Sequence, residues 1–283
     1  MAKAIMIQGT ASGVGKTVLT LALCRIFAQD GYRVAPFKAQ NMTQNTYTTE
    51  RGDEIAVSQW LQALAAGIEP TSDISPIVLK PTREGTEVVV SGRSHGPINI
   101  DGFRQTKKAL ANIVQNSYNK LSSAYDIIVI EGAGSPVELN LNQNDIVNMG
   151  MAKIAKAPVI LVSDIDRGGV FASLFGTINL MDDVERAYVK ATVVNRFRGD
   201  VAGFRDGKKI IENITKLPVA GVIPYTHIDL PEEDGLDGSK NVERLPSIDS
   251  ISCLNQQFDK IVETVRGSLD MQLIYEILNN GVE

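Results

Sequence analysis

The residues from Gln8 to Thr17 form a glycine-rich stretch that ends in Gly-Lys-Thr and directly follows the apolar run 4–7. Backbone N–H groups of such a loop, together with the N-terminus of a following helix, hold phosphate oxygens. Lys16 would then reach the β- and γ-phosphates of a nucleotide, and Thr17 would bind Mg²⁺. A chance glycine-rich turn is the alternative, and the strand-loop-helix setting argues against it. The residues expected to contact the nucleotide are Gly9, Thr10, Ser12, Gly13, Val14, Gly15, Lys16 and Thr17.

A phosphate-binding loop of this kind needs a second acid for the cation, and two carboxylates qualify. Glu131 ends the apolar run in 126–134, where the core needs no acid, and a carboxylate buried there is usually paired or metal-bound. Glu54 is the other metal-ligand candidate, but a first-turn helix carboxylate favoured by the helix dipole is an equal reading. Lys38 ends a predicted strand and would either neutralise charge in phosphoryl transfer or be an ordinary solvated lysine.

The stretch 164–169, "DIDRGG", places further polar groups between a predicted strand and a predicted helix. Its glycines, Gly168 among them, let a ligand approach the backbone and open an anion site. Arg167 would hold a substrate carboxylate with two parallel hydrogen bonds, and Asp166 would lie beside it. A purely structural Asp–Arg pair is the alternative.

The elements that must position these residues are short apolar runs alternating with longer amphipathic ones. Continuous β-branched runs separated by helices predict an α/β fold of the P-loop NTPase type, with a mostly parallel sheet and helices on both faces. Ligands of such sheets bind at the carboxyl ends of the strands, where this sequence has its glycines and polar residues. Strands are expected at 4–9, 32–38, 126–134, 157–166, 189–197 and 217–225, with a further strand of unclear setting at 86–92, and helices at 15–31, 53–67 and 103–125.

The chain divides into three parts. Residues 1–234 carry the nucleotide-binding pattern, 235–253 read as a polar linker, and 254–283 have apolar residues at helical spacing. The last part is expected to form one or two helices, bent near Gly267, that pack on the body of the fold.

Composition narrows the class of function. The chain has 283 residues, of which 43% are hydrophobic and 22% charged, as in an ordinary soluble globule. Its net charge of −5 argues against a nucleic-acid partner. Two distant cysteines fit a reducing cytoplasm, and two histidines make a His-rich metal site or a Ser-His-Asp hydrolase improbable. No apolar run approaches the ~20 residues of a membrane span, and the N-terminus does not read as a signal peptide.

Taken together, the motifs resemble the cobyric acid synthase family and, more broadly, the dethiobiotin synthetase-like ATP-dependent amidoligases. The family also uses the G-x5-G-K-[ST] loop found here, which is one residue longer than the common phosphate-binding loop. The resemblance runs from residue 1 to about 234. The matching stretches are "MIQGTASGVGKT", "VAPFKAQNMTQN", "SPIVLKPT", "VIEGAGSPVELNL", "DIVNMG", "DIDRGGVFASL", "NRFRGD" and "VIPYTHIDLPEED".

The resemblance implies a reaction in cobalamin biosynthesis. Enzymes of this family amidate peripheral carboxylates of adenosylcobyrinic acid a,c-diamide with ATP and Mg²⁺. ATP phosphorylates a carboxylate, and ammonia then displaces phosphate from the acyl phosphate. Lysines and Mg²⁺ suit this chemistry because they offset charge between two anions.

The resemblance also assigns roles to individual residues. Lys16, Lys38 and Asp145 match residues that act on the reacting groups, Asp145 near the substrate carboxylate. Asn195 matches an adenine-reading asparagine, although a turn residue is its plain reading. The metal ligands would be Thr17, Glu54 and Glu131, and the substrate site would be lined by Gln40, Asn41, Asn45, Asp166, Arg167 and Gly168.

The sequence departs from the family pattern after residue 234. Full-length members carry a glutamine amidotransferase domain, whereas here Cys253 lacks the glycines of a nucleophile elbow. Ammonia is therefore expected from solution or from a separate glutaminase. The expected partners are the corrinoid substrate and ammonia, with a separate glutaminase and a second copy of the chain as further candidates.

Three alternatives stay open: a dethiobiotin synthetase-like ligase acting on another carboxylate, a ParA-like partitioning switch, and a non-catalytic remnant that binds nucleotide or corrinoid.

Overall fold

The structure is a computed structural model that describes residues 1–82, 85–98, 100–140, 145–227, 230 and 248–282. Its centre is a six-stranded sheet in which every neighbouring pair of strands is parallel. The strand order is β12 (Val219–Pro224), β11 (Val189–Phe197), β10 (Val159–Asp164), β1 (Lys3–Gly9), β9 (Ile127–Glu131) and β2 (Val34–Phe37). The predicted α/β class and all six predicted strands of this sheet are confirmed.

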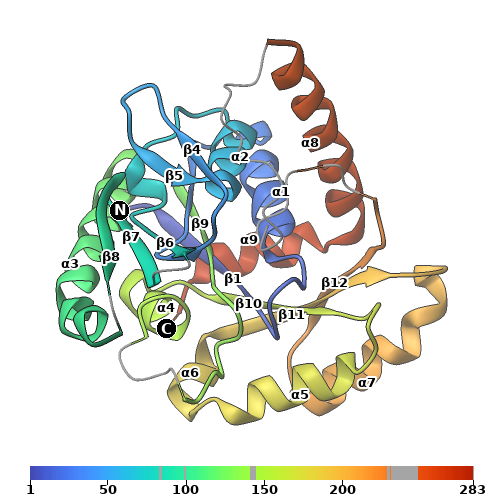
Figure 1. Ribbon diagram of the computed structural model, residues 1–283. Helices are drawn as coiled ribbons and strands as arrows, with labels where there is room; N and C mark the ends of the chain where they lie inside the picture. Colours follow the sequence, from blue (N-terminus) through green and yellow to red (C-terminus); the bar gives the residue numbers. More distant parts are fainter. Residues whose placement is uncertain (83–84, 99, 141–144, 228–229, 231–247, 283) are drawn as a thin grey trace.

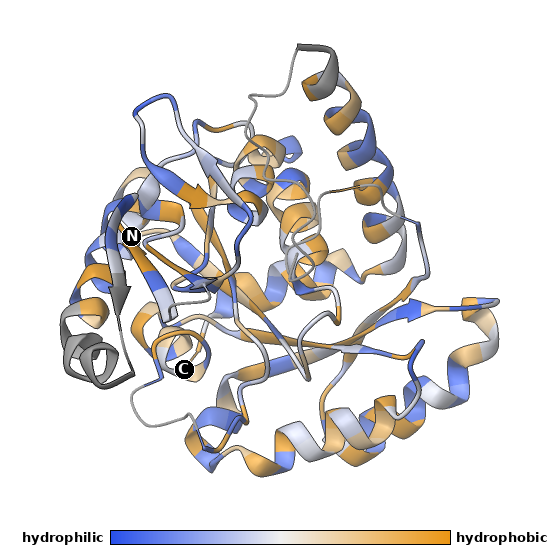
Figure 2. Ribbon diagram, viewed as in Figure 1, coloured by the Kyte–Doolittle hydropathy of each residue, from blue (hydrophilic) through white to orange (hydrophobic). Residues whose placement is uncertain are grey.

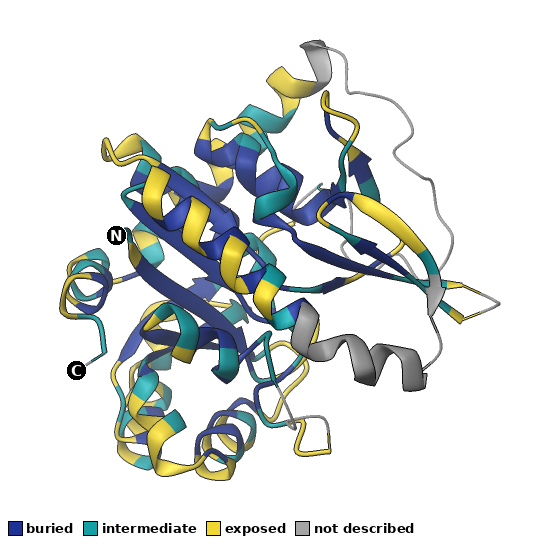
Figure 3. Ribbon diagram, turned by 90° about the vertical axis from the view of Figure 1, so that its left-hand side faces the viewer, coloured by how far each residue is buried: buried dark blue, intermediate teal, exposed yellow. Residues whose placement is uncertain are grey.

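Helices cover both faces of the sheet, which explains why most residues of its strands are apolar (Figures 1 and 2). On one side α1 (Lys16–Gln29) packs against α2 (Val57–Ala66) and α8 (Ile248–Ser268), and on the other α5 (Val170–Leu180) packs against α7 (Arg205–Thr215). All residues of β10 are buried, as Figure 3 shows for most of the sheet. Further helices are α3 (Ile100–Ala124), α4 (Met149–Ala155), α6 (Asp183–Tyr188), η1 (Ser72–Ile74) and η2 (Val201–Phe204).

A second layer between β2 and α3 was not predicted from the sequence, apart from one strand. It contains a four-stranded sheet and a two-stranded hairpin. The strand expected at 86–92 is β7, and it lies antiparallel between two neighbours. The strands of this layer are β3 (Asn41–Met42), β4 (Thr46–Thr48), β5 (Glu54–Ala56), β6 (Ile77–Thr82), β7 (Gly85–Val90) and β8 (Arg93–Ile98).

The boundaries of one predicted helix change because of this layer. The helix expected over 53–67 begins only at Val57, because Glu54–Ala56 pair with Thr46–Thr48 as β5 and β4. The interpretation of Glu54 as a first-turn helix carboxylate is therefore wrong.

The C-terminal segment forms two helices that belong to the main body. α8 begins at Ile248, inside the predicted linker, whose residues 235–247 lie outside the described residues. Helix α8 ends at Ser268 and not at a bend at Gly267, and α9 (Met271–Asn280) follows. The break is fixed by the Asp270 N–H, which donates to the carbonyl of Ala220 at the edge strand β12.

Two ion pairs tie α8 to α1 and to the residue that caps it. Arg25 pairs with Asp259 at 2.8 Å, and Arg266 pairs with Asp30 at 2.9 Å. Phe258 is fully buried in the core. Within the described residues, no helix has both the length and the apolar character needed to cross a bilayer.

Candidate active site

The phosphate-loop residues lie between the end of β1 and the first turn of α1, as predicted. Gly15 has φ of 99°, and a Cβ there would lie 2.1 Å from the Nδ2 atom of Asn195, so only glycine fits. The Lys16 ammonium donates to the carbonyl oxygens of Ala11 at 3.0 Å and Gly134 at 3.1 Å. The buried lysine head is thus held at the centre of the loop, where phosphate oxygens would replace neutral carbonyls.

Asn195 joins the loop from the end of β11. Its Nδ2 donates to the carbonyl of Val14 at 2.9 Å, and its Oδ1 accepts from the N–H of Arg196. A residue far along the chain therefore reaches the loop, which agrees with a role beside the nucleotide.

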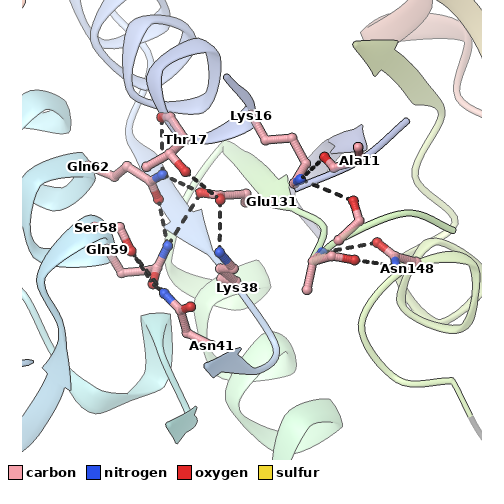
Figure 4. A network of polar contacts seen from close by, with 12 residues as sticks. Ala11, Lys16, Thr17, Lys38, Asn41, Ser58, Gln59, Gln62, Glu131 and Asn148 are labelled. Atoms are coloured by element: carbon pink, nitrogen blue, oxygen red, sulfur yellow. Dashed lines mark hydrogen bonds and ion pairs between the residues drawn. The ribbon is translucent and has the colours of Figure 1, made fainter. Parts of the chain in front are cut away.

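Glu131, at the end of β9, is the centre of the site (Figure 4). Its Oε1 accepts from the hydroxyl of Thr17 at 2.8 Å and from the ammonium of Lys38 at 2.9 Å. The Glu131 side chain is 0% exposed and that of Lys38 is 5% exposed. Strands β1, β9 and β2 are neighbours, so Glu131 and Lys38 at the ends of β9 and β2 meet Thr17 at the start of α1, which follows β1. The alternative of a solvated Lys38 is wrong.

These groups fit a magnesium ion held together with nucleotide phosphates. A hydroxyl and a carboxylate oxygen are hard ligands, and Mg²⁺ in such sites takes one or two protein oxygens and completes its shell with phosphates and water. Across the described residues there is no cluster of three or more His, Cys, Asp or Glu side chains suited to a metal. Thr17 and Glu131 would thus hold a cation through the nucleotide and not in an all-protein cage.

Glu54, the third predicted metal ligand, has other partners. Its carboxylate accepts from the hydroxyl of Thr46 at 2.5 Å and from the ammonium of Lys80 at 2.7 Å. It therefore helps to hold the β4–β5 hairpin against β6.

Two glutamines of α2 were missed by the sequence analysis. Gln62 Nε2 donates to Glu131 Oε2 at 2.6 Å, and Gln59 Nε2 approaches the same oxygen at 3.4 Å. Asn41, predicted to line the substrate site, instead donates to the side chains of Ser58 at 2.9 Å and Gln59 at 3.0 Å. In the sequence, the only sign of the two glutamines is a pair of amide side chains three residues apart in a largely apolar helix.

Asp145 contacts the backbone of its own loop. Its carboxylate accepts from the N–H groups of Val147 at 2.8 Å, Asn148 at 3.0 Å and Gly150 at 2.8 Å. Asn148, also missed, donates to the carbonyl of Ala133 at 2.6 Å and accepts from its N–H at 3.0 Å. In this structure Asp145 orders the start of α4, and Asn148 fixes the glycine loop after β9.

Two ion pairs join β10 to β11, one between the ends of the strands and one between the loops that follow them. The buried Asp164 pairs with Arg196 at 2.9 Å. Asp166 pairs with Arg198, whose hydrogen bonds lower the pKa of the Asp166 carboxyl. The predicted substrate residue Arg167 is exposed, so the Asp–Arg pair of this region forms between two loops and not between neighbours.

The other predicted substrate residues lie near the second layer or in the glycine turn. Gln40 is half-buried after β2, and the Asn45 N–H donates to the Thr43 hydroxyl at 2.9 Å. Gly168 has φ of 80° just before α5, which is the backbone conformation that favours glycine.

Comparison with known proteins gives a matching family and similar proteins. The family model described as "CobQ/CobB/MinD/ParA nucleotide binding domain" matches residues 5–236. The cobyric acid synthase of Lachnoclostridium phytofermentans is 52% identical over 241 residues, covering 83% of this chain and 47% of that protein. The cobyric acid synthase of Ruminiclostridium cellulolyticum is 52% identical over 237 residues, covering 83% and 46%. The chain spans about half the length of the curated relatives it matches.

Among solved structures, the MinD cell division protein of Aquifex aeolicus aligns at 18% identity and a TM-score of 0.42, covering 80% of this chain and 83% of that one. The signal recognition particle 54 kDa protein of Aeropyrum pernix aligns at 14% identity and a TM-score of 0.48, covering 94% and 49%. The resemblance to cobyric acid synthases seen in the motifs is confirmed by the curated relatives. The chain belongs to the CobQ/CobB/MinD/ParA nucleotide-binding-domain family.

Proposed function

We propose that this protein is an ATP-dependent amidoligase that converts peripheral carboxylates of a corrinoid, adenosylcobyrinic acid a,c-diamide, into amides. One observation carries the proposal: the phosphate loop, the Thr17–Glu131 oxygen pair and the buried ammonium of Lys38 meet at one edge of the sheet. A switch or a binding module needs the loop and the cation ligands. A second buried lysine beside them suits a reaction in which a phosphoryl group moves between two anions.

The proposed chemistry has two steps. A substrate carboxylate oxygen attacks the γ-phosphorus of ATP, which forms an acyl phosphate and releases ADP. Ammonia then attacks the acyl carbon, the C–O bond to phosphate breaks, and an amide and inorganic phosphate leave. Lys16 and Lys38 would offset the repulsion between the two anions, which are the substrate carboxylate and the γ-phosphate. A bound Mg²⁺ would offset the charge of the phosphates.

Residues at the edge of the site would complete recognition. Asn195 touches the phosphate loop and would contact the adenine, and the exposed Arg167 would hold a substrate carboxylate. Asp145 would act indirectly, through Asn148 and the glycine loop. We assign the active site to residues 1–234 and give the C-terminal helices a packing role, because α8 packs on α1 and on β12.

Ammonia would come from solution or from a separate glutaminase. Cys24 is buried within α1, and burial raises the pKa of its thiol, which makes it a poor nucleophile. Cys253 lies within α8 and not in a sharp glycine turn between strand and helix. Neither cysteine is therefore placed to release ammonia from glutamine.

The test is an incubation of the protein with Mg-ATP, ammonium and adenosylcobyrinic acid a,c-diamide, read by mass spectrometry. Each conversion lowers the substrate mass by about one dalton, because NH₂ replaces OH at the acyl carbon. Phosphate release should match the number of amides formed, and glutamine should not replace ammonium.

Two lysine variants make the assay specific. Lys16→Met should abolish amide formation, whereas Lys120→Met, at an exposed pair on α3, should leave it unchanged. Binding of ATP without any mass shift would reject the corrinoid amidation. It would favour another carboxylate substrate, in the manner of a dethiobiotin synthetase, or a protein that only binds nucleotide.

A further inference from the structure

We propose that Gln59 and Gln62 are positioning residues for the cation, and that they set the Mg²⁺ affinity of the nucleotide site by holding the Glu131 carboxylate in one orientation. The inference rests on the proposed Mg-nucleotide site. It does not depend on which carboxylate is amidated.

The two oxygens of Glu131 have different partners (Figure 4). Oε1 contacts the Thr17 hydroxyl at 2.8 Å and the Lys38 ammonium at 2.9 Å. Oε2 accepts from the amides of Gln62 at 2.6 Å and Gln59 at 3.4 Å. One oxygen is therefore kept beside the hydroxyl that would share the cation, and the other is held from behind.

Gln62 connects both protein ligands of the expected cation. Its Nε2 also lies 3.3 Å from the backbone carbonyl of Thr17, so a single amide reaches the residue that supplies the hydroxyl and the residue that supplies the carboxylate. This amide therefore couples the start of α1 to the end of β9. A shift of either ligand would break one of its two contacts.

The direction of both amides is fixed by a chain of donors and acceptors. Asn41 Nδ2 donates to Gln59 Oε1 at 3.0 Å, which leaves the Gln59 nitrogen to face Glu131. Gln59 Nε2 donates in turn to Gln62 Oε1 at 3.3 Å, which turns the Gln62 nitrogen toward the same carboxylate. Gln59, Gln62 and Glu131 are all 0% exposed, so water does not compete for these bonds.

Amides suit this role better than charged donors. Lys38 already balances the charge of Glu131, and a second cationic donor on Oε2 would reduce the attraction of the carboxylate for Mg²⁺. A neutral amide fixes the carboxylate without adding charge. Hydrogen-bond partners that orient metal ligands typically contribute about 10–100-fold to metal affinity.

The test compares nucleotide binding with and without the cation. Isothermal titration of the full chain with ATP, without any corrinoid, is performed in Mg²⁺ and again in EDTA. The ratio of the two dissociation constants measures the contribution of the cation. Gln62→Met keeps the length of the side chain and removes the donor, so this ratio should fall by about 10–100-fold. Affinity in EDTA should stay within about twofold of the wild type, because the variant leaves the phosphate loop intact.

Direct binding of Mn²⁺ to the ATP complex, followed by electron paramagnetic resonance, should show the same loss. The matched control is Gln115→Met, which changes an exposed glutamine of α3 and should leave both constants unaltered. Gln62→Asn keeps an amide but shortens the reach, and it carries the test if the methionine variant fails to fold. Gln59→Met should reduce the ratio less than Gln62→Met, because its contact with Glu131 is longer.

Equal weakening in Mg²⁺ and in EDTA would overturn the proposal, since the glutamines would then support only the fold. An unchanged ratio in Gln62→Met and Gln62→Asn would also overturn it, as would a wild type that binds ATP equally well with and without Mg²⁺. Failure of corrinoid amidation in the separate assay would leave all these measurements interpretable. The two proposals can therefore fail independently.

Discussion

Removing Lys38 is the sharpest test of the buried ion pair at the centre of the site. Lys38→Met leaves a side chain of similar length but takes the cation away from Glu131, which has no exposed surface. The pair is 2.9 Å long, and at an effective dielectric constant of 20 its attraction is about 6 kcal/mol before the cost of burying both charges. Removing one partner of a buried pair typically costs about 3–5 kcal/mol.

The expected loss lies at the lower end of this range. Glu131 keeps hydrogen bonds from Thr17 and Gln62 after Lys38 is removed, so part of its charge stays solvated by the protein. We therefore expect the free energy of unfolding to fall by about 3 kcal/mol. For a chain of this size that corresponds to a melting temperature lower by about 6–12 °C.

The assay is thermal and urea unfolding of five proteins at pH 7: the wild type, Lys38→Met, Glu131→Gln, the double variant and the control Lys120→Met. Because the double variant leaves no unpaired buried charge, it should be more stable than Lys38→Met alone, with a coupling energy of about 2 kcal/mol or more. Lys120→Met removes an exposed lysine from its pair with Asp73 and should cost less than about 1 kcal/mol. Additive effects of the two single changes would refute the buried pair, as would equal losses in Lys38→Met and Lys120→Met.

Two further predictions concern the phosphate loop and an ion pair at the amino ends of the strands of the main sheet. Gly15→Ala should abolish ATP binding, because its Cβ would lie 2.1 Å from Asn195. The control is Gly31→Ala, which adds similar backbone strain at a φ of 93° but has open space around it. This control should bind ATP normally in the same titration. Hydrogen bonds from Arg33 lower the pKa of Asp126 to about 2, so the stabilisation by this pair should be complete above about pH 4 and lost as the pH falls toward 2. A carboxyl titration by NMR should move back toward the ordinary value in Arg33→Leu, and an unmoved midpoint would contradict the assignment.

The sequence predicted the parallel sheet and the residues at its carboxyl edge for one physical reason. Strands buried on both faces are apolar throughout, so the first polar residue after each run marks the strand end. Glu131 was found in this way, whereas Asn195 was identified only through the family resemblance. Lys38 was found by the same rule, although the rule did not reveal that its ammonium lies 2.9 Å from a carboxylate.

Part of the second layer escaped prediction because β3, β4 and β5 are only two or three residues long, too short to show an alternating pattern in the sequence. Glu54–Ala56 are only three residues long, and their apolar neighbours continue smoothly into the pattern of α2. The helical period of 3.6 residues therefore predicted Glu54–Ala56 as part of the helix, although pairing with Thr46–Thr48 sets their conformation. The end of the predicted linker lies inside α8, because the first residues of this helix mix serines and an aspartate with isoleucines and resemble the chain before them.

The partners of buried polar groups could not be predicted either. Gln59 and Gln62 look like polar positions of an amphipathic helix, and only the approach of α2 to β9 turns them toward Glu131. The alternative of a structural Asp–Arg pair within 164–169 did not include the arginine that Asp166 contacts, because Arg198 comes from the loop after another strand. Hydrogen-bond partners more than a few residues apart depend on the fold, so a motif gives the residue but not its contacts.

The charged groups of the site have hydrogen-bond partners before any ligand binds, and the kind of partner bears on how a nucleotide would enter. Lys16 donates to two neutral carbonyls, which a phosphate replaces at little cost because an anion is the stronger acceptor. Lys38 instead donates to the carboxylate of Glu131. It would therefore turn to a phosphate only if a cation replaced it as the partner of Glu131. The ammonium of Lys38 would thus become available to the reacting phosphate when Mg²⁺ binds, which links the proposed chemistry to the oxygen that Gln59 and Gln62 hold in place.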